Sequence, residues 1–88
     1  MRKPEFTGAF RQDIQVAKKR KKDMKKLEVL MGLIIEESPI PEKYKTHPLK
    51  GDYIDYTDSH IEPDWLLIYR IKDDRVLFAR TGSHSDLF

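Results

Sequence analysis

The sequence has no cysteine among its 88 residues. It can therefore form neither a disulfide nor a thiolate metal site, and it fits a reducing compartment. Enzymes with a cysteine nucleophile are also excluded. Long apolar runs are missing as well, because the longest, at 65–69 and 33–35, fall far short of the roughly 20 residues that cross a bilayer. No signal peptide precedes them. These absences predict a soluble, cytoplasmic protein with no membrane partner.

The length and the charge pattern set further limits. A chain of 88 residues that is 39% hydrophobic is long enough for one domain, residues 1–88, and too short for two. Residues 1–50 carry thirteen Lys/Arg against seven Asp/Glu, a balance of +6, and residues 51–88 carry four against eight, a balance of −4. The excess of positive charge centres on "KKRKKDMKK" at 18–26.

Helical periodicity dominates the first 37 residues. Thr7 is a suitable N-cap for a helix that begins near Gly8, after a short strand at 4–6. Apolar residues then recur three and four positions apart, first at Phe10, Ile14 and Ala17, and later at Met24, Leu27, Met31 and Ile34. The second pattern stops before "SPIP". We expect two helices packed as a hairpin.

The remaining sequence changes to the periodicity of strands. After an irregular, proline-bearing segment at 39–51, "DYIDYTDSHI" at 52–61 alternates with period two. "WLLIYRI" at 65–71 is typical of a strand buried on both faces, and "VLFARTG" at 76–82 reads as a third strand. Turns at 62–64 and 72–75 join them. We expect a three-stranded antiparallel meander packed on the helices, with the opening strand added at an edge.

This topology gathers the titratable residues at one end of the sheet. His60 and Asp64 flank the first turn, and the third strand returns to the same end near His84. Asp58 lies two residues before His60 and faces the same side, and the preceding loop brings in His47. Paired imidazoles can act as base and acid near neutral pH, and carboxylates can orient them. The sequence thus predicts an acid–base site.

Other interpretations of these residues stay open. A histidine at a strand end is usually structural, and an aspartate beside a proline usually belongs to a turn. Three histidines and a carboxylate can also hold zinc, but no HExxH-like spacing favours that site. We expect no metal and no cofactor.

Three segments resemble one family of bacterial toxins. They are "THPLKG" at 46–51, "DSHIEPDWLLIY" at 58–69 and "RTGSHSDLF" at 80–88. In order and spacing they resemble the YafQ-like toxins, a branch of the RelE/ParE superfamily of type II toxin–antitoxin systems, over essentially the whole chain. The resemblance implies a microbial-ribonuclease-like α+β fold, with two N-terminal helices on a twisted antiparallel sheet of about four strands. It also implies an mRNA interferase, a metal-independent endoribonuclease that cuts mRNA on the translating ribosome and is held inactive by a cognate antitoxin.

The resemblance also implies the roles of individual residues. The family's active-site positions fall on His47, Asp58, His60, Asp64, His84 and Phe88. His84 and His60 would form the acid/base pair, with His47 in proton transfer or phosphate contact. The two aspartates would orient the rings, and Phe88 would offer a flat face for a base. Relatives commonly carry arginine where this chain has Thr57. Arg80 is the candidate to replace that cation at the phosphate, and a structural ion pair is the alternative for it.

The basic run is expected on a helix, as a solvated face or as a polyanion-binding surface. We expect it to bind ribosomal RNA rather than the scissile strand, through Lys18, Lys19, Arg20, Lys21, Lys22, Lys25 and Lys26. Two other functions remain as alternatives. One is a non-catalytic domain that binds RNA or protein through this run. The other is a gyrase-inhibiting member of the same superfamily, although such a protein has no evident need for an acid/base pair.

Overall fold

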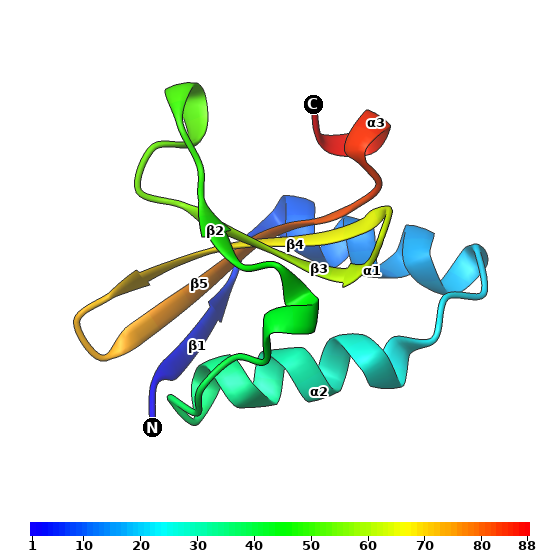
Figure 1. Cartoon of the computed structure of the whole chain (residues 1–88). Coiled ribbons are helices and arrows are strands. Elements are labelled where there is room, and N and C mark those ends of the chain that lie inside the picture. Colours follow the sequence, from blue (N-terminus) through cyan, green and yellow to red (C-terminus); the bar gives the residue numbers. More distant parts are fainter.

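The structure is a computed structural model that describes all 88 residues. The chain opens with β1 (Lys3–Phe6), α1 (Gly8–Lys19) and α2 (Met24–Ile35), as Figure 1 shows. A middle segment follows with the 3-10 turns η1 (Glu42–Tyr44) and η2 (Gly51–Tyr53) on either side of the short strand β2 (His47–Pro48). The last elements are β3 (Thr57–Glu62), β4 (Trp65–Lys72), β5 (Arg75–Gly82) and α3 (His84–Leu87). None of the helices is long and apolar enough to span a bilayer.

The strands form one sheet in the order β1-β5-β4-β3-β2. The predicted α+β class and the meander of β3, β4 and β5 are confirmed, and β1 lies at an edge as expected. The prediction of an antiparallel sheet of about four strands was wrong in two details. The short β2 adds a fifth strand, and β1 runs parallel to β5. Lys3 pairs with Arg75, directly after the β4–β5 turn, so both strands start at the same end of the sheet.

Both long helices cover one face of the sheet. Thr7 caps α1 by accepting a hydrogen bond from the backbone N–H of Phe10 (2.9 Å), and Asp23 caps α2 in the same way at Lys25 (3.2 Å). Their apolar stripes join one core with the inner sides of β4 and β5, including Leu30, Trp65 and Phe78. The helices pack on the sheet more than on each other, which corrects the expected hairpin.

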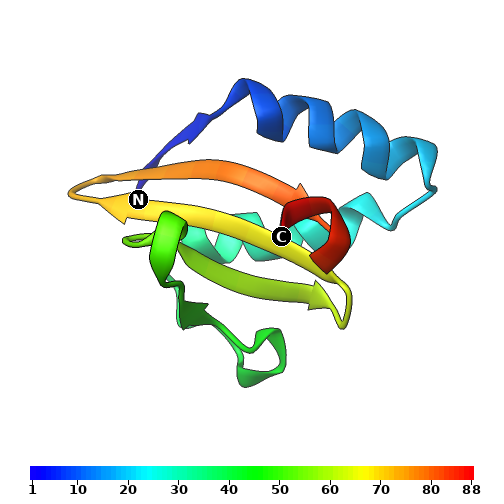
Figure 2. The ribbon, with the colours of Figure 1, turned by 90° about the horizontal axis from the view of Figure 1, so that it is seen from above.

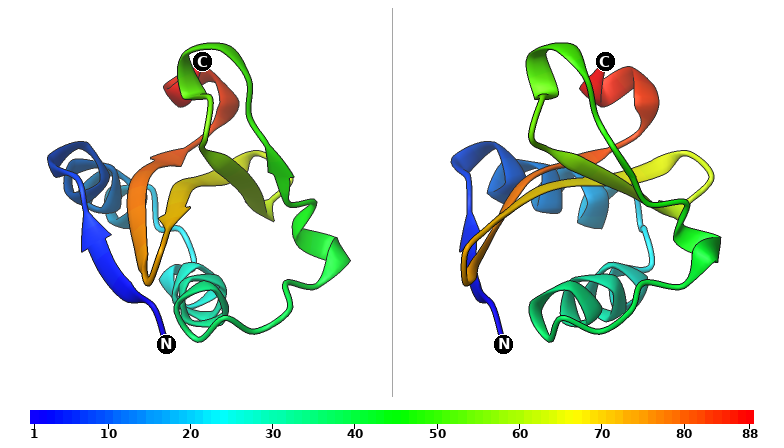
Figure 3. Two further views of the ribbon diagram at one scale, coloured as in Figure 1. Left: turned by 90° about the vertical axis from the view of Figure 1, so that its left-hand side faces the viewer. Right: turned by 60° about the vertical axis from the view of Figure 1, so that its left-hand side comes forward.

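The opposite face of the sheet carries α3 and the loop around η2. Figures 2 and 3 show these two segments standing on the side away from α2. Beneath them lies a second, smaller cluster of Leu66, Ile68, Ala79 and Leu87. This face holds the residues that the sequence predicts for the site.

The predicted strand at 52–61 begins only at Thr57. Gly51 and Asp55 both have a positive φ, 67° and 75°, which ends extended structure at each of them. The chain therefore turns at η2 and lays Tyr53 and Tyr56 over the smaller cluster. The alternation of side-chain types could not reveal this turn, because Asp55 interrupts the extended backbone while the alternation continues through it.

Sequence reasoning also missed α3. Its signal is the "SHSD" segment, in which Ser83 caps the helix and the Asp86 side chain reaches back to the backbone N–H of Ser83 (2.9 Å). This reciprocal arrangement is a capping box with aspartate at the third position. The helix is only one turn long, so apolar periodicity could not mark it.

Candidate active site

The three imidazole rings form a row along one end of the sheet. The ring centroids of His47 and His60 are 6.0 Å apart, and those of His60 and His84 are 5.7 Å apart. β2, β3 and α3 supply one ring each. The structure thus brings together the three histidines, as the sequence topology predicts.

A buried carboxylate lies between the first two rings. Asp58 is 4% exposed, and its Oδ1 is 3.4 Å from Nε2 of His60 while its Oδ2 is 3.6 Å from Nε2 of His47. Oδ1 has no hydrogen-bond partner in the protein. A buried carboxylate is costly unless cations or donors face it, and the polar groups that face Asp58 are the Nε2 atoms of these two rings.

Strand pairing and one backbone contact position His47. It pairs with Asp58 across β2 and β3, which places the two side chains side by side. Its Nδ1 lies 2.9 Å from the carbonyl oxygen of Lys45. A carbonyl only accepts, so Nδ1 carries the proton and Nε2 is the nitrogen that faces the site.

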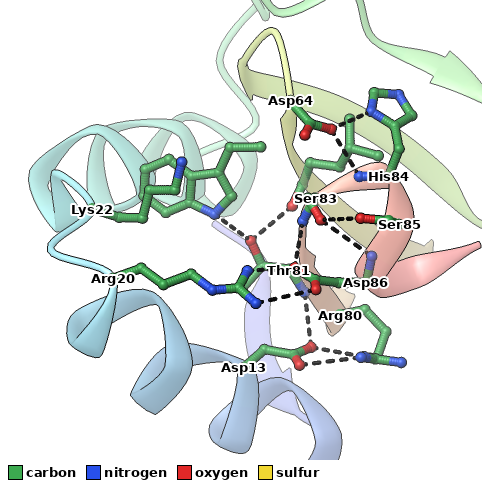
Figure 4. Close-up of polar contacts among 12 residues, drawn as sticks. Asp13, Arg20, Lys22, Asp64, Arg80, Thr81, Ser83, His84, Ser85 and Asp86 are labelled. Atoms are coloured by element: carbon green, nitrogen blue, oxygen red, sulfur yellow. Dashed lines mark hydrogen bonds and ion pairs between the residues drawn. The ribbon is translucent and has the colours of Figure 1, made fainter.

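Asp64 holds both the backbone and the ring of His84. Its Oδ1 accepts from the backbone N–H of His84 (2.9 Å) and from Nδ1 of the same residue (2.6 Å), as Figure 4 shows. These two hydrogen bonds, the backbone one first, lower the pKa of Asp64 below its ordinary value. The carboxylate therefore stays ionised, Nδ1–H is the donor, and Nε2 of His84 is free of this bond.

A second carboxylate fastens α3 to the basic run. Arg20 binds Asp86 through both terminal nitrogens, at 2.6 and 3.2 Å (Figure 4). Arg20, followed by the donors of Ser83, holds the pKa of Asp86 well below its usual range. A Cβ at Gly82 would lie 3.0 Å from the Asp86 side chain, so glycine permits this close approach. The turn that carries His84 is thereby tied to residues far away in the sequence.

Phe88 stands at the far end of α3 and is 62% exposed. Its ring meets Tyr53 at a centroid distance of 5.6 Å and an angle of 75°. Tyr53 in turn meets Tyr56 at 6.1 Å, and the Arg70 guanidinium lies 5.4 Å from the Tyr56 ring. Sequence reasoning missed Tyr53 as the neighbour of Phe88, because it assigned Tyr53 to a strand.

Arg80 makes a structural ion pair in this structure. Its Nε and Nη2 bind the carboxylate of Asp13 on α1, at 2.7 and 3.1 Å, and the same carboxylate accepts from the backbone N–H of Thr81 at 3.1 Å. The hydrogen bonds that the Arg80 guanidinium donates to Asp13 raise the pKa of Arg80. Of the two roles that the sequence allows, this geometry matches the ion pair.

The basic run does not lie on one helix, contrary to the expectation. It covers the end of α1, the turn that follows and the start of α2. Lys22 and Lys26 both bind Glu62, at 3.6 and 3.0 Å, and Arg20 binds Asp86. Four cations of the run are exposed and form no ion pair, namely Lys18, Lys19, Lys21 and Lys25. The basic run therefore contains four cations without an ion pair and three cations that pair with carboxylates beside the candidate site.

His47, Asp58 and His60 also offer ligand atoms that lie within 4.8 Å of one another. Two imidazoles and a carboxylate suit a borderline metal such as copper or zinc. The "metal-bound toxin" of Helicobacter pylori has a similar structure, with a TM-score of 0.93, 39% identity and coverage of 100% of both chains. The sequence led us to expect no metal site, but the structure has a cluster of possible metal ligands. Local sequence spacing could not reveal this cluster, because its residues come from two separate strands.

Comparisons with known proteins agree over nearly the whole chain. A family model described as "Bacterial toxin of type II toxin-antitoxin system, YafQ" matches residues 2–88. The mRNA interferase toxin YafQ of Escherichia coli K12 is 48% identical over 85 residues, which cover 96% of this chain and 92% of that protein. The crystal structure of YafQ from E. coli BL21(DE3) has a TM-score of 0.95 at 46% identity, and covers 100% of this chain and 99% of its own. YafQ in the E. coli DinJ–YafQ complex has a TM-score of 0.94 at 47% identity, with the same coverage. The chain therefore belongs to the YafQ family of bacterial toxins of type II toxin–antitoxin systems.

Proposed function

We propose that this toxin is an mRNA interferase, an endoribonuclease that cuts mRNA on the translating ribosome. The observation that carries the proposal is the row of three imidazoles flanked by two carboxylates. RNA supplies its own nucleophile, so a protein that cuts it needs only a base, an acid and positive charge near the phosphate. The row can provide all three. The name of the E. coli K12 relative, an mRNA interferase toxin, supports the same reaction.

In the proposed reaction, the 2′-hydroxyl gives its proton to one imidazole and its oxygen attacks the adjacent phosphorus. The bond from phosphorus to the 5′-oxygen breaks, and a second, protonated imidazole gives its proton to that oxygen. The products are a 2′,3′-cyclic phosphate and a 5′-hydroxyl end. His84 and His60 form this pair, without a fixed division of the two roles. His47 contacts the phosphate or relays a proton.

The carboxylates position and polarise the rings. Asp64 holds His84 with Nδ1 protonated, so Nε2 is the atom that exchanges a proton with the substrate. Asp58 lies beside Nε2 of both His60 and His47 and orients these two rings toward the phosphate. Phe88, braced edge-on by Tyr53, offers one face on which a base of the mRNA stacks.

Partners follow from the family and the charge distribution. We propose that a cognate antitoxin holds this toxin inactive, as the E. coli DinJ–YafQ complex suggests for its relatives. We also propose that the exposed cations Lys18, Lys19, Lys21 and Lys25 attract ribosomal RNA. Arg20, Lys22 and Lys26 contribute less to that attraction, because carboxylates already neutralise them.

Induction of the toxin without an antitoxin should arrest growth and translation. Mapping of transcript ends after induction should then show new 5′-hydroxyl ends within translated frames. In a reconstituted system, cleavage should require the ribosome. Unchanged transcript ends in cells that accumulate folded toxin would refute the proposal, and arrest with intact transcripts but inhibited supercoiling would identify a gyrase inhibitor instead.

Cleavage should survive removal of metal ions. We propose that the imidazoles suffice for acid–base catalysis, since a metal held by His47, Asp58 and His60 would occupy the nitrogen lone pairs that accept protons. Chelated toxin should therefore cut at the original rate on ribosomes kept intact with Mg²⁺, and added Cu²⁺ should inhibit it. A purified toxin that loses activity on chelation and regains it with one equivalent of a transition metal would contradict this.

A further inference from the structure

A groove of about 450 Å³ opens beside the imidazole row, on the outer side of β3. His60 forms part of its wall, together with Ile61 and Glu62 of the same strand. The other wall comes from η1 and the residue after it, Lys43 to Lys45, and Lys26 of α2 closes one side. We call this site the lysine groove. Apart from His60, no residue of the lysine groove takes part in the proposed reaction.

The positive charge in the lysine groove is only partly neutralised. Glu62 binds Lys26 at 3.0 Å, and that hydrogen bond lowers the pKa of Glu62, which therefore stays ionised. Lys43 and Lys45 are exposed, and neither forms an ion pair with a carboxylate. The groove therefore keeps two free ammonium groups, which suit a phosphate rather than a neutral or cationic ligand.

The loop that carries these two lysines is anchored in the main hydrophobic core. The Tyr44 ring between them is 7% exposed and belongs to the main core, and Lys43 Nζ lies 5.2 Å from that ring. Lys45 takes a positive φ of 48°, and its carbonyl oxygen meets Nδ1 of His47. The same loop thus holds a catalytic histidine and the free cations in one rigid arrangement.

We propose that the lysine groove binds the backbone phosphate next to the scissile one, on the side of the cut away from Phe88. This inference rests on the proposed cleavage of mRNA. The groove begins at His60, so an RNA strand whose scissile phosphate lies on the imidazole row enters the groove when it continues past His60. Figures 1 and 3 show η1, which contains Lys43, and α3, which ends just before Phe88, on opposite sides of β3. The strand then runs from a stacked base at Phe88, across the imidazoles, to a phosphate held by Lys43 and Lys45.

The ligand is a phosphodiester and not a particular base. Contacts to phosphates fix the register of a nucleic acid without reading its sequence, so the groove positions the strand for the imidazoles. Lysines that act in this way should lower KM more than they raise kcat, because they bind substrate and transition state alike.

The test neutralises the two partners of the proposed contact in turn, the phosphate of the mRNA and the lysines of the toxin. Ribosomes are programmed with synthetic mRNAs in which a single phosphate near the cut is an uncharged methylphosphonate, moved one linkage at a time. Wild-type toxin is compared with the double variant Lys43→Gln/Lys45→Gln. A control, Lys3→Gln/Lys72→Gln, removes the same charge at the opposite end of the sheet.

We expect the wild type to lose about tenfold in kcat/KM when the linkage next to the cut is neutralised, as is typical for a charged hydrogen bond. The groove variant should be about tenfold slower on unmodified mRNA and insensitive to that linkage. The control should keep the wild-type sensitivity. If the groove variant loses a further tenfold at the same linkage, the contact does not exist and the inference is wrong.

Two results separate this inference from others. If wild-type toxin does not cut unmodified mRNA, the proposed function itself fails, whereas an active wild type with an unaffected groove variant overturns the groove alone. If the groove variant cuts normally but binds the antitoxin more weakly, the groove is a surface for acidic protein segments, which also overturns it.

Discussion

Replacement of His84 by asparagine should slow mRNA cleavage by about 10²–10⁴-fold and leave the fold intact. A side chain that moves a proton in the transition state typically contributes that factor. Asparagine can still donate to Asp64 through its amide, so the contact that orients residue 84 is retained. The asparagine amide can act neither as a general acid nor as a general base near neutral pH. The measurement is single-turnover cleavage on programmed ribosomes, with thermal unfolding of the purified protein beside it.

The structure gives reasons to expect a normal melting temperature. The His84 side chain is exposed, and α3 keeps the Ser83 cap, the Arg20–Asp86 pair and the buried Leu87. Phe88→Ala is the informative comparison. It removes a stacking surface and no proton donor, so we expect a smaller loss of about 10–100-fold. Full activity of folded His84→Asn toxin would move the acid–base role to His47 and His60.

Asp58→Asn should also slow cleavage by about 10²–10⁴-fold, with a melting temperature equal to or above that of the wild type. The substitution keeps the shape of the side chain and removes the negative charge that faces two imidazoles. Both rings then lose the carboxylate that orients them, and their contacts with the phosphate weaken. A buried carboxylate with one unpartnered oxygen is itself costly to fold, so its neutral replacement should not destabilise the protein.

A loss of activity without a loss of stability would distinguish this role from a structural one. The control is Asp74→Asn, which removes a carboxylate at the opposite turn, where it pairs only with Lys3 across 3.8 Å. It should leave cleavage unchanged. If Asp58→Asn lowers the melting temperature and Asp58→Ala does so further, with cleavage normal in the folded fraction, Asp58 supports the β2–β3 pairing and not the reaction.

The convergence of the histidines could be predicted because it depends on turn positions. Once Pro63 and the "KDDR" segment mark the two hairpins, residues 60, 64 and 84 must lie at one end of the sheet, and the structure places them there. His47 was harder to place, since only two residues of β2 pair with β3. The proline after His47 correctly indicated an extended backbone.

The features that sequence reasoning missed depend on contacts between distant segments. Nothing local in "KPEF" shows that it pairs in parallel with residues 75–78. Nothing in the basic run shows that Arg20 meets Asp86. The turn at Asp55 depends on the positive φ of that one residue, which the sequence pattern does not specify. Turn positions and the family resemblance predicted which residues form the candidate site, whereas the partner of each charged side chain required the fold.

The parallel pairing of β1 with β5 also has a consequence for the order in which the molecule folds. Residues 3–6 are synthesised long before their partners at 75–78, and α3 follows those partners in the chain. Chains emerge from the ribosome N-terminus first, and pairings between distant segments form late. A nascent chain that holds both long helices and β3 still lacks the edge pairing, the turn around His84 and the ring of Phe88. The imidazole row therefore cannot assemble until residues 75–84 have emerged, and until then the ribosome that makes the toxin carries an incomplete site.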